Sequence, residues 1–242
     1  MPEIIKTDVL AFGAHPDDVE LSCGGTIASL CAAGKTVGII DLTRGELGTR
    51  GSEEIRISEA RDAADILGVK IRENLSLRDC FFKDDESAWF EVIKIIRKYR
   101  PDIILTNAKD DRHPDHGKAA NLVKNAAFLS GLRKITTSEH GKIQEPWRPR
   151  KVFYSIQDRL MMPHFVIDIT PHFESKMNAI KAFKTQFFNP QSTEPKTYIS
   201  SPHFLPFLEA RAREMGHLIG AEFGEGFLSD TPVGLDDITL LK

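Results

Sequence analysis

Residues 8–26 read DVLAFGAHPDDVELSCGGT, and this stretch decides the fold. Its first seven residues form an apolar run, which predicts a buried strand. A histidine, a proline and two aspartates (residues 15–18) follow where that strand would end. Proline and aspartate are ordinary turn residues, so a simple turn is one interpretation. A metal site is the other, and the rest of the sequence has to decide between them.

Apolar runs alternate with helix-period segments along the first half of the chain. The expected strands cover 8–14, 36–42, 69–75 and 102–107. The helices expected between and after them cover about 22–33, 52–67, 89–96 and 115–129. This order predicts a Rossmann-like α/β fold, a mostly parallel sheet with helices on both faces. Because no repeat, low-complexity tract or boundary interrupts the pattern, we expect a single domain over 1–242.

The second half of the chain is less regular. Strands are expected at 151–157 and 164–170, followed by a helix that starts at Thr170-Pro171 and carries Met177, Ile180, Phe183 and Phe187. A helix at 203–216 and a short segment at 222–227 complete the fold. Between them, 188–202 contains three prolines and no periodicity. A loop of this length in a compact domain is typical of a lid, a binding loop or an interface arm.

Composition excludes several classes of function. The 242 residues are 41% hydrophobic and 28% charged, with a net charge of -3, so no strong attraction to nucleic acid or an anionic membrane is expected. No apolar run approaches the ~18 residues that span a bilayer, and charge interrupts the N-terminus before a signal-peptide core forms. Three cysteines without a Cys-x-x-Cys pair predict neither a disulfide framework nor a thiolate zinc cluster. We therefore expect a cytoplasmic protein.

His-Pro-Asp occurs twice, as HPDD at 15–18 and as HPDH at 113–116. Each copy follows an expected parallel strand, so the two open onto the same edge of the sheet, where such folds bind ligands. Two imidazoles and one carboxylate, from His15, Asp18 and His116, leave a divalent ion with a place for water, as catalytic zinc requires. The paired motif thus favours a metal site over a turn. Iron(II) also suits this ligand set.

The remaining polar residues of the two motifs suit amide hydrolysis. Asp17 stands beside the ligands as a general base for the attacking water. His113 could stabilise the oxyanion and protonate the leaving amine, with Asp115 orienting its ring. A structural zinc site is disfavoured because such sites use four ligands and prefer cysteine. Gly24-Gly25 is not a phosphate loop, because neither G-x-G-x-x-G nor a Walker motif is present.

With these residues in hand, the chain resembles the LmbE/PIG-L family of zinc-dependent N-acetylglucosamine deacetylases. The similarity runs from about residue 8 to residue 228 and rests on AHPDD (14–18), DLTRGELGTRG (41–51), EIRISEARDAADILGV (54–69), HPDH (113–116) and AEFGEGF (221–227). The combination is similar to the bacillithiol-biosynthesis branch, whose enzymes convert N-acetylglucosaminyl-malate to glucosaminyl-malate and acetate. The resemblance implies a Rossmann-like fold, the same ligands and base, and homo-oligomers, often hexamers.

The resemblance also bears on how the substrate is bound. Arg56 matches a family arginine expected to contact the substrate, and Arg44, Arg50 and Arg112 fall in or beside loops at the same edge. Arginine forks suit the two carboxylates of malate, although exposed loop arginines often contact nothing. Where some relatives have a tyrosine, this chain has Phe204, and Tyr198 in the long loop is the alternative source of a hydroxyl.

Two other functions compete with this interpretation. A sister amide hydrolase would act on chitooligosaccharides or thiol-sugar conjugates. A metal- or nucleotide-binding module without turnover is compatible with the fold, since fold does not fix function. Asp17 discriminates against the module, because a pure binding site needs no second carboxylate beside its ligands.

Overall fold

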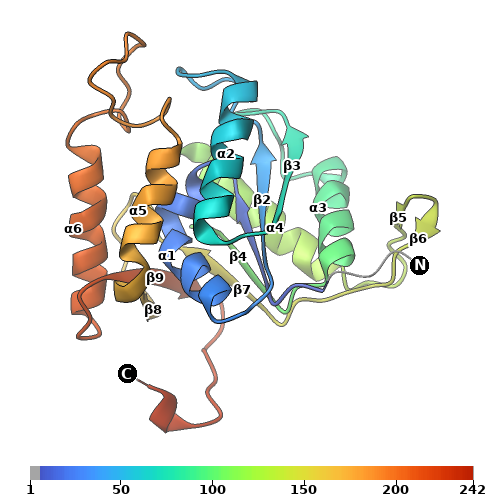
Figure 1. Cartoon of the computed structure of the whole chain (residues 1–242). Helices are drawn as coiled ribbons and strands as arrows, with labels where there is room; N and C mark the ends of the chain where they lie inside the picture. The colour runs from blue at the N-terminus through green and yellow to red at the C-terminus, as the bar shows by residue number, and fades with distance from the viewer. Residues whose placement is uncertain (1–5, 242) are drawn as a thin grey trace.

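The computed structural model describes residues 6–241, and Figure 1 shows a twisted sheet with helices on both sides. Seven strands form this sheet in the order β3-β2-β1-β4-β7-β9-β8. Neighbours from β3 to β7 are parallel, whereas β9 runs antiparallel to both β7 and β8. The strands are β1 (Val9–Gly13), β2 (Val37–Thr43), β3 (Ile71–Leu77), β4 (Ile103–Asn107), β7 (Lys151–Ser155), β8 (Phe165–Asp168) and β9 (Gly224–Ser229). The expected single-domain, mostly parallel α/β fold is confirmed.

The helices divide between the two faces of the sheet. One face is covered by α1 (Asp18–Ala32), α2 (Glu53–Leu67), α5 (Phe173–Ala182) and α6 (Phe204–His217). The other face is covered by α3 (Glu86–Tyr99) and α4 (Pro114–Leu129). The short elements are the hairpin β5 (Ser138–Glu139) and β6 (Lys142–Ile143), and the 3₁₀ turns η1 (Thr170–His172) and η2 (Ile238–Leu240).

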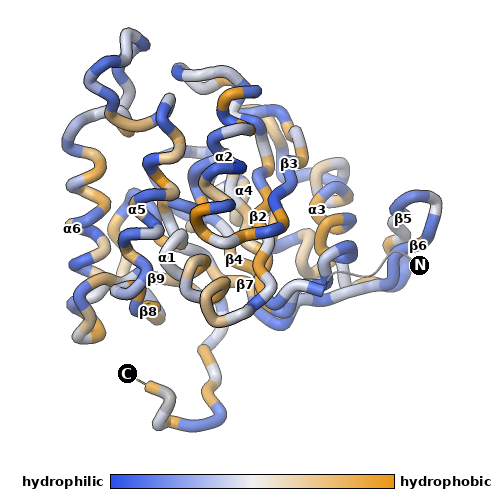
Figure 2. The backbone as a smooth tube through the Cα atoms, in the orientation of Figure 1, coloured by the Kyte–Doolittle hydropathy of each residue, from blue (hydrophilic) through white to orange (hydrophobic). Residues whose placement is uncertain are grey.

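Side chains of the central strands alternate between two hydrophobic cores. In β1, Val9 and Ala11 pack with the α1, α2 and α5 layer, whereas Leu10 and Phe12 pack with α3 and α4. This follows from the two-residue period of a strand, which sends successive side chains to opposite faces. Both faces are covered, so the strand is apolar throughout, and Figure 2 shows mixed blue and orange on the surrounding helices.

Local sequence signals explain where the helices near the site begin and end. Ser52 accepts a hydrogen bond from the N–H of Ile55 and begins α2, and Gly68 ends it with φ 77°. Pro114 occupies the first turn of α4, where its missing N–H costs nothing. These caps fix α2 and α4 just beyond the sheet edge that carries the two motifs.

Three boundaries differ from the expectations. The first helix begins at Asp18, directly after HPD, rather than near residue 22. The helix expected to carry Phe183 and Phe187 ends at Ala182, yet both side chains are buried. The Phe187 ring stacks on Phe204 of α6 at 5.9 Å between centroids, so tertiary packing outweighs the helical period there. The segment expected at 222–227 is β9, an antiparallel strand inside the sheet.

The strand order explains why the motifs meet. β1 and β4 are neighbours, while their chains continue to opposite faces through α1 and α4. Such a switch point opens a crevice at the carboxyl ends of the strands. Among the helices described over 6–241, none has the length and apolar character needed to cross a membrane.

Candidate functional site

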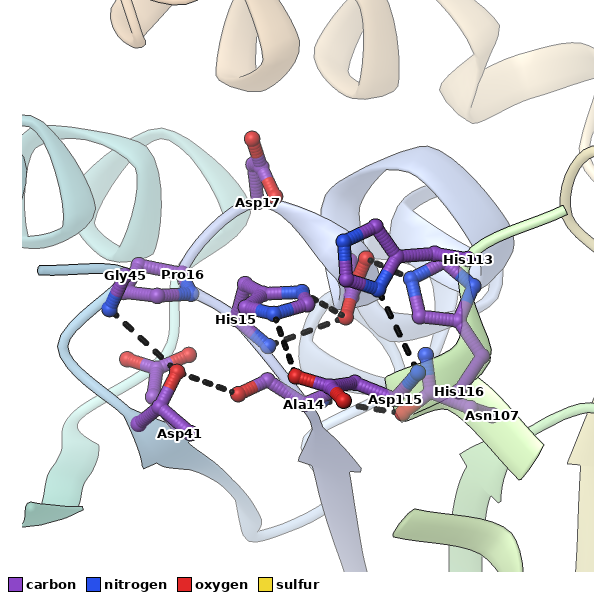
Figure 3. Close-up of polar contacts among 12 residues, drawn as sticks. Ala14, His15, Pro16, Asp17, Asp41, Gly45, Asn107, His113, Asp115 and His116 are labelled. Atoms are coloured by element: carbon purple, nitrogen blue, oxygen red, sulfur yellow. Dashed lines mark hydrogen bonds and ion pairs between the residues drawn. The ribbon is translucent and has the colours of Figure 1, made fainter. Parts of the chain in front are cut away.

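The two His-Pro-Asp motifs lie against each other at the carboxyl ends of β1 and β4 (Figure 3). The ring centroid of His15 is 4.7 Å from that of His113 and 5.9 Å from that of His116. His113 and His116 are 5.4 Å apart. Each of the three rings can place a nitrogen within 4.8 Å of the others. The sequence prediction that both motifs share one site agrees with this arrangement.

The carboxylate of Asp18 lies between two of these rings. Its Oδ1 is 3.0 Å from Nε2 of His116, and its Oδ2 is 3.4 Å from Nδ1 of His15. Two imidazole nitrogens and one carboxylate thus converge from two loops, a donor set that fits a zinc or iron(II) ion. The residues predicted as ligands therefore have the positions and the chemistry to hold a metal.

The outward nitrogens of these rings are held by other carboxylates. Nε2 of His15 is 3.0 Å from Asp79 and 3.4 Å from Asp115. Nδ1 of His116 is 2.6 Å from Asp111. A carboxylate on the second ring nitrogen fixes the tautomer and orientation of a metal-binding histidine, so this pattern supports the candidate ligand set. His15, Asp79 and Asp115 also form a cluster with metal-binding geometry, but both carboxylates face the same outward nitrogen.

Asp79, Asp111 and Gln157 were missed by the sequence reasoning. Asp111 accepts hydrogen bonds from the backbone N–H groups of Arg112, Asp158 and Arg159, at 2.8, 3.2 and 2.9 Å, besides holding His116. Gln157 donates from Nε2 to Asp18 at 3.0 Å. All three follow strands that end at this edge, so the strand-end rule that located the motifs is the signal that could have found them.

The structure corrects the expected role of Asp115. Its carboxylate faces His15 and accepts a hydrogen bond from the N–H of Cys80 at 2.9 Å, rather than orienting His113. What reaches His113 is the backbone N–H of Asp115, which donates to Nδ1 at 3.3 Å. Because Nδ1 accepts, the proton of a neutral His113 ring is on Nε2, which is then a donor.

Burial and neighbouring charges give the two carboxylates of HPDD different pKa values. Burial raises the pKa of Asp17 to about 7, although the positive charge of Arg56 opposes the rise. Burial would also raise the pKa of Asp18, but the charges and hydrogen bonds of His116 and His15 hold it well below its usual value. Neighbouring carboxylates with separated pKa values are typical of acid–base sites.

The pKa values of the three histidines also differ from one another. Burial disfavours the charged ring of His116, but Asp18 and Asp111 outweigh it and raise its pKa to about 9. His15 is also buried, and hydrogen bonds to three carboxylates raise its pKa. For His113, burial and then the charges of the two neighbouring histidines lower the pKa.

A cavity of about 280 Å³ opens above these residues. Loops that follow β2, β3 and β4 and the long loop 188–202 form its walls. This volume is just below the range of about 300–1,000 Å³ that is typical of small-molecule sites. The lining includes His15, Asp17, Asp18, Leu47, Arg50, Arg56, Asp79, Cys80, Arg112, His113, His116, Gln157, Gln186, Thr197, Tyr198 and Ile199.

The four predicted substrate arginines differ in what they contact. Arg56 is buried and donates to the carbonyl of Gly45 at 3.2 Å, to that of Pro16 at 2.8 Å and to Asp17 at 3.3 Å. Arg44 pairs with Glu53 at 2.7 Å and lies outside the cavity lining found over 6–241.

The other two arginines both hold the long loop. Arg50 is buried and donates to the carbonyls of Thr185 (2.6 Å) and Pro195 (3.3 Å) and to Oγ of Ser192 (2.9 Å). The guanidinium of Arg112 lies 4.4 Å from the ring centroid of Tyr198 and is partly exposed. Of the two aromatic candidates, Tyr198 lines the cavity and Phe204 is buried beside it, with ring centroids 5.5 Å apart.

Sequence comparisons show similarity to named deacetylases. The family model PIG-L, GlcNAc-PI de-N-acetylase, matches residues 10–127. The diacetylchitobiose deacetylase of Thermococcus kodakarensis is 29% identical over 228 residues, covering 90% of this chain and 81% of that protein. The 1D-myo-inositol 2-acetamido-2-deoxy-alpha-D-glucopyranoside deacetylase of Thermobispora bispora is 30% identical over 188 residues, covering 64% of this chain and 60% of that protein.

A solved structure extends the match to almost the whole chain. The conserved protein TT1542 from Thermus thermophilus superposes with a TM-score of 0.85 at 32% identity, covering 96% of this chain and 98% of that one. Almost the whole chain therefore has the fold of a solved structure.

Proposed function

We propose that this chain, whose residues 10–127 match the PIG-L family model, removes the acetyl group from N-acetylglucosaminyl-malate, releasing glucosaminyl-malate and acetate. The observation that carries the proposal is the convergence of His15, Asp18 and His116, with Asp17 buried beside them in the cavity wall. An unactivated amide needs a Lewis acid, a base and a proton donor, and this cluster can provide positions for all three.

We assign the metal to His15, Asp18 and His116, with zinc as the resident ion and iron(II) as the alternative. When bound, such an ion supplies Lewis acidity at the amide carbonyl and makes water a better nucleophile. Asp79 and Asp115 orient His15, and Asp111 orients His116.

Asp17 moves the proton, and His113 stabilises the developing charge. Asp17 accepts the proton of the attacking water, and Arg56 at 3.3 Å keeps the carboxylate in place. His113 presents its Nε2 donor, because Nδ1 is occupied by the N–H of Asp115. It stabilises the charge that develops on the carbonyl oxygen, and Asp17 then passes the proton it took from water to the leaving amine, because a neutral His113 ring has no acidic proton to give.

Arg112 is the arginine best placed to bind a malate carboxylate. Arg50 and Arg56 are buried and already donate to loop carbonyls, and Arg44 pairs with Glu53. Arg112 lines the cavity, is partly exposed and lies 3.4 Å from its partner Asp158. A partly free guanidinium fork suits a planar carboxylate.

Other N-acetylglucosamine conjugates are the main alternative, because the relatives are named as deacetylases of diacetylchitobiose and of an inositol 2-acetamido-2-deoxy-glucopyranoside. A chitooligosaccharide or a thiol-sugar conjugate would use the same catalytic residues. A metal-binding module without turnover is disfavoured by the buried Asp17. A cytoplasmic location and a homo-oligomer, such as a hexamer, stay predictions.

The test measures acetate release by the zinc-loaded protein from N-acetylglucosaminyl-malate, diacetylchitobiose and free N-acetylglucosamine at equal concentrations. We expect the malate conjugate to have the highest kcat/KM, and Arg112→Met to reduce that preference without affecting free N-acetylglucosamine. A preference for diacetylchitobiose would move the assignment to a sister substrate. Zinc-loaded protein that releases no acetate from any of them would favour the binding module.

A further inference from the structure

Helix α1 is broken at Cys23, which has φ −143° and ψ 21°, five residues after the candidate ligand Asp18. Such a break leaves carbonyls of the first half and N–H groups of the second half without helical partners. Two buried side chains from other elements lie in the break. They are Lys176 of α5 and Glu225 of β9, each 4% exposed.

The pair satisfies both sides of the break. The carboxylate of Glu225 accepts hydrogen bonds from the N–H groups of Gly25 (2.9 Å) and Thr26 (2.7 Å), and from the hydroxyl of Thr26 (2.6 Å). Lys176 Nζ donates to the carbonyl of Leu21 at 2.8 Å and pairs with Glu225 at 2.5 Å. Glu225 therefore caps the second half of the helix, while Lys176 ties down the end of the first half.

The Gly24-Gly25 pair makes this insertion sterically feasible. A Cβ on Gly25 would lie 2.8 Å from Ile169, and one on Gly24 would lie 3.4 Å from Lys176. A side chain at Gly25 would therefore push α1 away from Ile169, whereas one at Gly24 would only touch Lys176. Gly25 thus has a packing role at the break.

Residues at the end of β7 also hold the first half of α1 in place. Ser22 contacts Oγ of Ser155 at 2.9 Å, and Gln157 donates to Asp18 at 3.0 Å. With Lys176 on the carbonyl of Leu21, groups outside the helix hold residues 18–22 at several points. This short segment carries the carboxylate that lies between His15 and His116.

We propose that the buried Lys176–Glu225 pair is a positioning element for Asp18, holding the broken first half of α1 where its carboxylate can bind the metal. The proposal rests on the metal assignment made above. A buried ion pair is a weak source of stability, because desolvation offsets the attraction, and apolar replacements are often neutral or stabilising. Apolar side chains, however, cannot satisfy the N–H and carbonyl groups at the break. The hydrogen bonds of the pair therefore fix the geometry of the break.

The test compares the double variant Lys176→Met/Glu225→Met with the wild type. Zinc affinity is measured by chelator competition, thermal unfolding is followed on the metal-free protein, and visible absorption is recorded with cobalt(II). We expect a variant that still folds, with a lower metal-free midpoint because the backbone groups at the break lose their partners, and with zinc binding weakened about 10-fold or more and an altered cobalt spectrum. The matched control Arg213→Met/Glu209→Met removes an exposed pair on α6 and should match the wild type in all three.

Zinc affinity within twofold of wild type, with an unchanged cobalt spectrum, would overturn the proposal. If the double variant does not fold, Glu225→Gln decides instead. It keeps an oxygen acceptor but loses the charge, so zinc binding should still weaken, and unchanged binding would overturn the proposal. Wild-type protein that binds no zinc would instead refute the metal assignment itself, which keeps the two failures distinct.

Discussion

Asp17 has a backbone conformation that non-glycine residues rarely adopt. Its φ is 119°, and its side chain is 5% exposed in the wall of the cavity. Such strain costs of order 1–3 kcal/mol and tends to occur at functional sites, where the surrounding structure maintains it. The adjacent Asp18 begins α1 and faces the histidines, so the strained turn lets consecutive carboxylates take different roles.

Asp17→Asn tests this division of roles. The amide is nearly isosteric but cannot accept the proton of water, so kcat should fall by about 10²- to 10⁴-fold. Zinc content should stay near that of the wild type, because Asp17 is not an assigned ligand. Acetate release and metal analysis on the same preparation provide the measurement. Full zinc content with a near-normal rate would exclude Asp17 as the base.

The cysteines provide a test that does not depend on catalysis. Burial raises the pKa of Cys23 to about 12, so roughly one thiol in ten thousand is ionised at pH 8. Cys80 is exposed at the cavity, although burial and the charges of Asp79 and Asp115 raise its pKa as well. The thiolate is the reactive form, so both rates should increase with pH.

On the native protein, we therefore expect iodoacetamide to label Cys80 before Cys23, and Cys23 to react only after unfolding. Peptide mass spectrometry over a pH series is the measurement. Bound substrate should slow labelling of Cys80, because that residue lines the cavity. Rapid labelling of Cys23 in the folded protein would contradict its placement in the core.

Site residues that belong to a sequence motif could be predicted, whereas site residues outside the motifs were missed. His15, Asp18 and His116 were found because His-Pro-Asp repeats after two parallel strands. Asp79 and Asp111 stand alone in sequence, and they acquire a role only through proximity to the rings. The Asp115 carboxylate was assigned to the wrong histidine because sequence neighbours need not face each other.

Among the elements, loop 188–202 depends on contacts from side chains outside it, above all that of Arg50. Buried Arg50 uses three nitrogens on Thr185, Ser192 and Pro195, and the carbonyl of Arg50 accepts a hydrogen bond from Gln186. Thr197, Tyr198 and Ile199 of the same loop line the cavity. The residue that fastens the loop therefore also controls one wall of the site.

Arg50→Ala should loosen this loop. Charged hydrogen bonds contribute about 1.5–3 kcal/mol each, so losing them should speed proteolysis within 188–202 by about 10-fold or more and raise KM. Limited proteolysis with mass spectrometry, alongside kinetics, is the measurement, and Arg213→Ala on α6 is the control. Unchanged proteolysis with a raised KM for the malate conjugate alone would mean that Arg50 contacts substrate directly, as the sequence suggested.

The element boundaries show where local patterns stop being informative. Ser52 and Gly68 mark the ends of α2 through local capping, and both were visible in the sequence. The end of α5 at Ala182 depends on Phe183 and Phe187 packing into a core shared with α6. The antiparallel direction of β9 depends on pairing with β7 and β8 and has no local signature.

In the whole molecule, the order of the strands in the sheet brings the two halves of the site together. Alternating strands and helices predicted a parallel sheet, and the order β3-β2-β1-β4 then places the ends of β1 and β4 side by side. The sequence could predict that both motifs lie at one sheet edge. It could not predict that α1 is broken after its first turns, because the break depends on Lys176 and Glu225 arriving from distant elements.

The central claim is that this fold holds a metal-dependent N-deacetylase, and one measurement tests it most directly. Protein stripped with a chelator is titrated with zinc while acetate release from N-acetylglucosamine conjugates is followed. The account predicts no release from the stripped protein and a rate that rises in proportion to zinc until one ion per chain is bound. A stripped protein that remains fully active, or a zinc-saturated protein that releases no acetate from any conjugate, would contradict it.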